Sequence, residues 1–213
     1  MGKAALDRYF KIKEKIPSHV FLLAVSKGHS LEFLEQCLSL KDFPREWGEN
    51  YFDELQAKAS KIKEVNWHFL GALQSRKILE ICKLASCIHS VSRLKELKLF
   101  RGAQSLPKFY LQVNISHESQ KNGASVEELE QLLMELKTSN LEENFLGLMG
   151  MAAPIDVVGE MEVARQYSEL RKIRDTYCSG KKLNMGMSGD YNIAIAEGSD
   201  LIRVGTAIFG ERL

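Results

Sequence analysis

The sequence has little of several features that mark particular classes of protein. Its four cysteines include no CxxC pair, so we expect no disulfide framework, and a reducing, cytoplasmic location is predicted. Its four prolines mark no linker, which favours one domain over residues 1–213. Its longest uninterrupted apolar run, 20–25, is far too short to cross a bilayer, so no membrane partner is expected.

An excess of one charge is also missing. Lysine and arginine number 29 against 28 acidic residues, which leaves a formal net charge of +1. A surface that binds a phosphate backbone needs an excess of basic side chains. The best basic cluster, Lys11, Lys13 and Lys15, alternates with isoleucine and glutamate and is typical of a solvated helix face. We therefore expect no nucleic-acid partner.

Short catalytic motifs are absent as well. The sequence contains no GxSxG, P-loop, GxGxxG or HExxH pattern. Its histidines show no convincing metal-ligand spacing either; they are His19, His29, His68, His89 and His117. We therefore expect no metal site, and the chemistry must come from residues that the fold brings together.

Short apolar runs alternate with longer amphipathic segments along the whole chain. The candidate strands are residues 19–25, 45–48, 67–71, 87–91, 109–115, 145–151, 183–187 and 201–205. The clearest helices are 30–40, 51–63, 125–137 and 156–178, and Ser125 with Glu128 forms a capping box. This alternation predicts an α/β fold, and eight strands are the number that closes a (β/α)₈ TIM-type barrel. The alternative is an open, doubly wound sheet, but the first strand is followed by SKGHS, which has one glycine where such sheets have a glycine-rich turn.

The carboxyl ends of the strands are where a barrel of this type carries its site. The last two strands end in Ser188-Gly189 and Gly205-Thr206, small and hydroxyl residues that suit a phosphate, although ordinary turns use the same residues. Lys27 follows the first strand, which barrel closure places beside the eighth. An amine near an anion site can capture a carbonyl, whereas a solvated lysine is the plainer alternative. Pyridoxal phosphate carries both a phosphate, which would suit the anion site, and an aldehyde, which the amine could capture.

Two further polar residues lie within predicted strands. Arg203 in the eighth strand needs a partner if buried: either an acidic neighbour such as Glu49 or Asp190, or the ring nitrogen of a cofactor. A permanently protonated arginine would oppose protonation of that nitrogen and weaken the ring as an electron sink. His68 lies between Trp67 and Phe69 and fits either a site or a hydrogen-bonded core position.

Several segments together resemble the pyridoxal phosphate homeostasis protein family, the single-barrel relatives of alanine racemase. They are LLAVSKG, WGENYFDEL, WHFLGALQSRK, VNISHESQKNG, GLMGMAAP and LNMGMSGDYNIAIAEGSDLIRVGTAIFG, in this order from about residue 22 to residue 210. The resemblance implies a fold-type-III pyridoxal phosphate barrel without the second, β-rich domain. It implies a Schiff base on Lys27, phosphate contacts from Ser188, Gly205 and Thr206, and a ring-nitrogen contact from Arg203. It also implies that Asn50, His68 and Met149 line the cofactor pocket.

The sequence leaves three candidate functions. The first is a cofactor carrier or regulator with little or no turnover, which passes pyridoxal phosphate to apo-enzymes as a monomer. The second is a small amino-acid racemase in which His68 or Lys27 acts as the base; because the chain ends at Leu213, we expect no second domain to supply a tyrosine base. The third is a barrel enzyme acting on sugar phosphates, with Lys27 as an aldolase lysine. No catalytic residue is assigned for the leading function.

Overall fold

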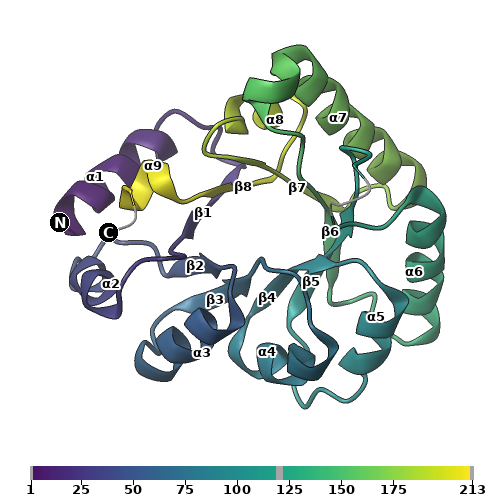
Figure 1. Ribbon diagram of the computed structural model, residues 1–213, viewed down its shortest axis with the longest axis horizontal. Helices are drawn as coiled ribbons and strands as arrows, with labels where there is room; N and C mark the ends of the chain where they lie inside the picture. The colour runs from purple at the N-terminus through teal and green to yellow at the C-terminus, as the bar shows by residue number, and fades with distance from the viewer. Residues whose placement is uncertain (1, 119–121, 212–213) are drawn as a thin grey trace.

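Eight parallel strands close into a barrel in the computed structural model, which describes residues 2–118 and 122–211 of the chain (Figure 1). Each strand pairs with the next, and β8 returns to pair with β1. The strands are β1 (Phe21–Val25), β2 (Glu46–Glu49), β3 (Asn66–Phe69), β4 (Cys87–Val91), β5 (Lys108–Val113), β6 (Phe145–Gly150), β7 (Lys182–Met187) and β8 (Leu201–Val204). The predicted (β/α)₈ barrel is confirmed. Residues 119–121 of the VNISHESQKNG segment lie outside the described part.

The helices form a ring around the outside of the barrel (Figure 1). They are α1 (Gly2–Lys13), α2 (Leu31–Leu38), α3 (Phe52–Lys61), α4 (Ile78–Leu84) after the 3₁₀ turn η1 (Ser75–Lys77), α5 (Leu94–Phe100), α6 (Val126–Thr138), α7 (Ile155–Tyr177), α8 (Tyr191–Ala196) and α9 (Thr206–Phe209). The predicted capping box opens α6: the backbone N–H of Glu128 donates to the Ser125 hydroxyl, and that of Ser125 donates to the Glu128 carboxylate. No helix in the described ranges is long and apolar enough to cross a membrane.

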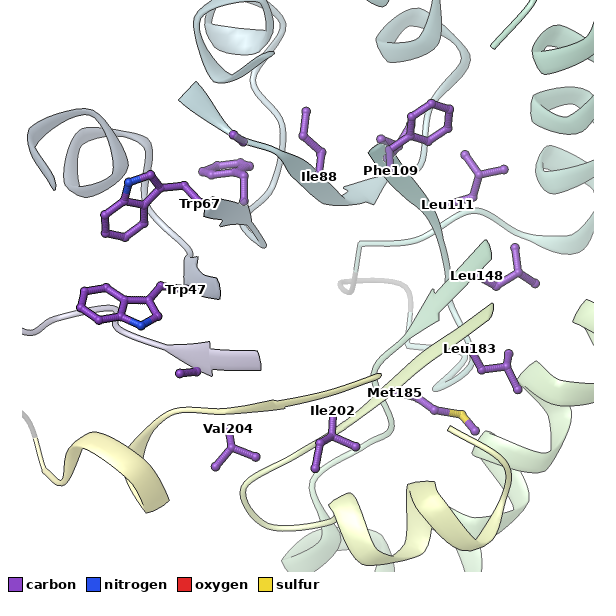
Figure 2. Close-up of a cluster of buried hydrophobic side chains, with 14 of the residues drawn as sticks. Trp47, Trp67, Ile88, Phe109, Leu111, Leu148, Leu183, Met185, Ile202 and Val204 are labelled. Carbon is purple, nitrogen blue, oxygen red and sulfur yellow. The ribbon is translucent and has the colours of Figure 1, made fainter. Parts of the chain in front are cut away.

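The main hydrophobic core lies between the strands and the helices. Successive side chains of a strand point to opposite faces, so one set from each strand faces outward. Figure 2 shows this outward set, with Trp47, Trp67 and Leu148 pointing from the strands toward the helices. The rings of Trp47 and Trp67 meet edge to face, with centroids 5.8 Å apart. Outward packing fixes which side chains of the same strands point into the barrel.

The barrel interior is a smaller cluster with a cavity at each end. Leu23, Cys87, Tyr110, Met149 and Leu201 pack together inside the ring. This cluster lies between a cavity at the carboxyl ends of the strands and a hollow at their amino ends. The two ends are therefore separate sites.

The ends of the described chain meet at one side of the ring. In Figure 1, α1 and α9 lie next to each other beside β1. The Arg8 Nε of α1 donates to the carbonyl of Ile208 in α9 at 2.6 Å. The pairing of β1 with β8 runs from Phe21 opposite Leu201 to Ala24 opposite Val204. Residues just after β1 and just after β8 are neighbours for this reason.

Candidate functional site

A cavity of about 310 Å³ opens at the carboxyl ends of the strands. It contains Lys27, Asn50, Ser188, Arg203, Gly205 and Thr206, which are predicted site residues. Its other lining residues are Val25, His29, Leu70, Met151, Met187 and Gly189. Segments far apart in the sequence thus converge because parallel strands present their carboxyl ends on one side of the ring.

Lys27 lies on a tight loop directly after β1 and is half-buried. Gly28 next to it has a φ of 76°, a left-handed conformation that glycine adopts without strain. The Gly28 N–H donates to Glu54 Oε2 of α3 at 2.8 Å. The His29 N–H donates to the Ser26 carbonyl at 3.2 Å. The loop that carries the amine is therefore held by hydrogen bonds on both sides of it.

A buried ionic network lies under this loop. Glu49 is fully buried at the end of β2, and its Oε1 accepts from the Ser26 hydroxyl at 2.6 Å and from Lys58 Nζ at 2.8 Å. Lys58 Nζ also donates to the Ser26 carbonyl at 3.0 Å and to Glu54 Oε2 at 2.8 Å. Burial raises the pKa of Glu49, and the Lys58 ammonium and the Ser26 hydroxyl oppose that rise. The network fixes Ser26, the residue before Lys27.

Arg203 is buried beneath the cavity. Its Nη2 donates to the Gly150 carbonyl at 3.3 Å, while its buried Nε has no hydrogen-bond partner among the described residues. Burial lowers the pKa of Arg203, and the nearby Tyr167 and Asp190 oppose that effect.

The acidic partners considered from the sequence are engaged elsewhere. Glu49 pairs with Lys58, and Asp190 accepts from the Tyr167 hydroxyl at 2.9 Å and from the Met187 N–H at 2.6 Å. The Arg203 Nε is therefore a buried donor without an acceptor among the described residues, and such a donor costs roughly 1–3 kcal/mol.

The wall of the cavity beside the lysine loop is built by small and hydroxyl residues from the ends of β7 and β8. The Gly205 N–H donates to Ser188 Oγ at 3.4 Å, which joins the turn after β7 to the turn after β8. A Cβ at Gly205 would lie 3.1 Å from the Val25 carbonyl, so glycine lets the end of β8 approach β1. Ser188 and Thr206 are exposed at this wall. Hydroxyls and the N–H groups that begin α9 can donate to an anion here.

Two predicted site residues lie outside this cavity. The His68 ring lines the hollow at the amino end of the barrel, where its Nε2 lies 2.8 Å from Glu46 Oε2. Met149 is buried in the interior cluster. The residues that do line the cavity here are Leu70 and Met151, which directly follow β3 and β6. Each follows its predicted counterpart by two positions, which is the spacing of one face of a strand.

His29 is a cavity residue that the sequence did not single out. Its ring packs against Phe33 and Phe209, with both centroids at 5.4 Å. The signal that could have found it is its place two residues after Lys27, on the same loop. With Lys27 and Arg203, it completes the titratable side chains among the described residues that line the cavity.

Sequence comparison finds relatives over nearly the whole chain. The alanine racemase N-terminal domain family matches residues 3–213. A pyridoxal phosphate homeostasis protein of Escherichia coli (strain K12) is 35% identical over 210 residues, covering 92% of this chain and 87% of that protein. One from Caenorhabditis elegans is 33% identical over 211 residues, covering 90% of this chain and 85% of that protein.

Solved structures give the same likeness. PipY of Synechococcus elongatus with PLP bound has a TM-score of 0.80 and 28% identity, covering 97% of this chain and 100% of that one. The alanine racemase of Bacillus anthracis has a TM-score of 0.74 at 17% identity, which shows a shared fold. It covers 99% of this chain but only 56% of the racemase chain.

Proposed function

Because this chain belongs to the pyridoxal phosphate homeostasis protein family, built on the alanine racemase N-terminal domain, we propose that it holds pyridoxal 5′-phosphate as a Schiff base on Lys27. Its role is in the homeostasis of that cofactor, as a carrier or regulator with little or no turnover. Bound pyridoxal phosphate supplies an aldehyde that an amine can capture and a ring that can withdraw electrons. The single observation that carries the site assignment is the unpaired, buried Nε of Arg203.

The cavity fits the three polar parts of this cofactor. Arg203 Nε offers a donor to the pyridine nitrogen, an acceptor when it is unprotonated. Lys27 offers the amine on the β1 side, where Glu49 and Lys58 hold its loop. Ser188 and Thr206 offer hydroxyl donors to the phosphate on the β7 and β8 side. Asn50, directly after β2, adds an amide to the polar lining. His68 and Met149 have no contact role in this proposal, since they lie outside the cavity.

The low turnover follows from the same residues. An arginine donor keeps the ring nitrogen unprotonated, so the ring draws electrons weakly. Removal of a proton from an amino acid also needs a base within reach. His68, one base considered for a racemase, is separated from this cavity by the interior cluster. These features favour holding and releasing the cofactor over racemisation.

Three companion predictions go with the role. Recipients are apo-enzymes that use pyridoxal phosphate, and the chain acts as a monomer of one domain, which sedimentation velocity measures. The compartment is the cytoplasm, because Cys37, Cys82, Cys87 and Cys178 are free thiols that suit a reducing environment. A cofactor transfer assay with a purified apo-enzyme tests delivery.

The direct test is reductive trapping. The purified protein is incubated with pyridoxal phosphate, reduced with borohydride, digested and analysed by mass spectrometry. We expect a pyridoxyl label on Lys27, no label in Lys27→Ala, and an unchanged label in Lys172→Ala, which alters an exposed lysine of α7. A label on another lysine would refute the site.

The two alternative functions have distinct outcomes. Sustained racemisation of L-amino acids above the free-cofactor rate, lost in Lys27→Ala, would favour the racemase. No labelling and no yellow colour, with binding of sugar phosphates, would favour the sugar-phosphate enzyme.

A further inference from the structure

Three metal-ligating side chains gather inside the barrel at the end away from the cofactor cavity. His68 on β3 lies beside Cys87 in the pairing with β4, and His89 follows Cys87 by two residues on the same strand. All three are buried, and their ligand atoms lie within 4.8 Å of one another. His68 Nδ1 and His89 Nε2 are 2.8 Å apart.

The polar atoms around the two rings form one chain. His68 Nε2 lies 2.8 Å from Glu46 Oε2, and His89 Nδ1 lies 2.7 Å from Asn184 Nδ2. With both rings neutral, each member of this chain donates to the next, from Asn184 to Glu46. This order leaves the buried Asn184 Oδ1 without a hydrogen-bond partner in the described part of the chain. Such an atom calls for an explanation in terms of an unrecorded ligand or group.

We propose that His68, Cys87 and His89 bind a zinc ion. Two imidazoles and a thiolate are a zinc ligand set, with a fourth position for water. Zn–N distances of about 2.0–2.1 Å in a tetrahedron place the two nitrogens about 3.3 Å apart, so rings now 2.8 Å apart separate only slightly. Cys87 releases its thiol proton to solvent on binding. The thiolate and the Glu46 carboxylate then balance the two positive charges of the metal.

The residues behind the rings support the same conclusion. A histidine that binds a metal through one nitrogen donates its other N–H to a carboxylate or carbonyl oxygen. Glu46 is already in that position behind His68. Behind His89, a half-turn of the Asn184 amide brings Oδ1 to the ring N–H. The orientation of an amide is assigned from its hydrogen-bond network, and this exchange gives Oδ1 a partner while it moves Nδ2 to the position that Oδ1 now occupies.

Access comes from the hollow at the amino ends of the strands. His68, Cys87 and Glu46 line this hollow, so the fourth position of the metal faces it. Tyr110 and Leu201 of the interior cluster also line it and separate it from the cofactor cavity. The inference therefore stands apart from the proposed cofactor role. The proposed ligands come from two different strands, so their spacing in the sequence does not match a metal-binding motif.

The experiment measures metal binding by the full-length protein with pyridoxal phosphate bound. Zinc is added in competition with a chromophoric chelator, and cobalt(II) is used in parallel because thiolate ligation gives it a charge-transfer band. We expect one zinc per chain and a thiolate–cobalt band, both lost in Cys87→Ser. Cys82→Ser, which alters a buried cysteine of α4, is the matched control and keeps both. Glu46→Gln weakens zinc binding by about 10–100-fold, the range for residues behind a ligand.

A second measurement does not depend on a folded variant. Zinc should protect Cys87 of the wild-type protein from alkylation, as read by mass spectrometry, while leaving the modification of Cys178 unchanged. Labelling of Cys87 that ignores zinc would overturn the proposal, as would a cobalt spectrum without a thiolate band. Equal zinc binding by wild type and a folded Cys87→Ser would do the same.

Discussion

Removal of the Lys58 ammonium leaves the buried Glu49 carboxylate without its cationic partner, beneath the loop that carries Lys27. In Lys58→Met, the fully buried Glu49 keeps the Ser26 hydroxyl on Oε1, and its Oε2 has no partner within residues 2–118 and 122–211. Breaking a buried ion pair by removing one member costs about 3–5 kcal/mol. We expect a loss of that size in the free energy of unfolding at pH 7. Lys61→Met, at an exposed lysine of the same helix, should stay within about 0.5 kcal/mol of wild type.

The loss in the free energy of unfolding caused by Lys58→Met should also depend on pH. Burial raises the folded-state pKa of Glu49 above its value in the unfolded chain, so the folded state binds the proton more tightly. Its contribution to stability is thus greatest below the unfolded pKa, near 4.5, and falls as the pH rises through the raised folded value. Without Lys58, the pKa of Glu49 rises further. The difference between Lys58→Met and wild type should therefore shrink as the pH falls from 7 toward 5.

Urea denaturation at both pH values measures these differences. The double variant Glu49→Gln/Lys58→Met removes the unpaired charge and should recover more than half of the loss. Lys58→Met should also weaken pyridoxal phosphate binding, because Lys58 holds the Ser26 carbonyl next to Lys27. The reasoning is wrong if Lys58→Met lowers the free energy of unfolding by less than about 1 kcal/mol at pH 7, because a loss that small is typical of an ion pair on the surface. A double variant less stable than Lys58→Met would refute it equally.

Three other substitutions probe the cavity and its support. Thr206→Ala should weaken pyridoxal phosphate binding by about 1 kcal/mol if its hydroxyl donates to the phosphate, as titration calorimetry measures. Arg203→Glu should let the ring nitrogen protonate and so change the absorption spectrum of the bound cofactor; an unchanged spectrum would count against its position. Tyr167→Phe removes a hydrogen bond to buried Asp190 and should cost about 1–3 kcal/mol in urea denaturation, whereas Tyr177→Phe on the same helix is the control.

The strand pattern could be predicted from the sequence because the barrel is covered by helices on its outer face. Nearly continuous apolar runs marked several of the eight strands, and the observed ends of all eight fall within two residues of the predicted ones. Even the short second strand is correct: Pro44 precedes it, and its carbonyl accepts from the Trp47 indole N–H at 2.8 Å. The nearly continuous runs did not show which residues face inward.

The site could be predicted best where a residue follows the end of a strand, although Arg203, inside β8, was also predicted and lines the cavity. Lys27, Ser188 and Thr206 come just after strands, and all three line the cavity. His68 and Met149 lie inside strands, where depth depends on strand tilt and stagger around the ring. Their placement at a different depth is a property of the closed barrel.

The support beneath Lys27 was hidden for another reason. Lys58 reads as a solvent-facing lysine on an amphipathic helix, yet only 4% of its surface is exposed. Its acceptors are Glu49 and Ser26, from the ends of two other strands, together with Glu54 on its own helix. A local sequence pattern around Lys58 cannot predict acceptors that other strands bring to it in the folded protein.

The pairing of β1 with β8 has a consequence for how the molecule forms. This seam joins the first strand made during synthesis to the last, so the ring stays open until β8 has emerged from the ribosome. A ligand touching both Lys27 and Thr206 bridges that seam and binds only the closed ring. At a hundred times its dissociation constant it adds about 2.7 kcal/mol against opening. The lifetime of the folded protein would thereby depend on the supply of pyridoxal phosphate.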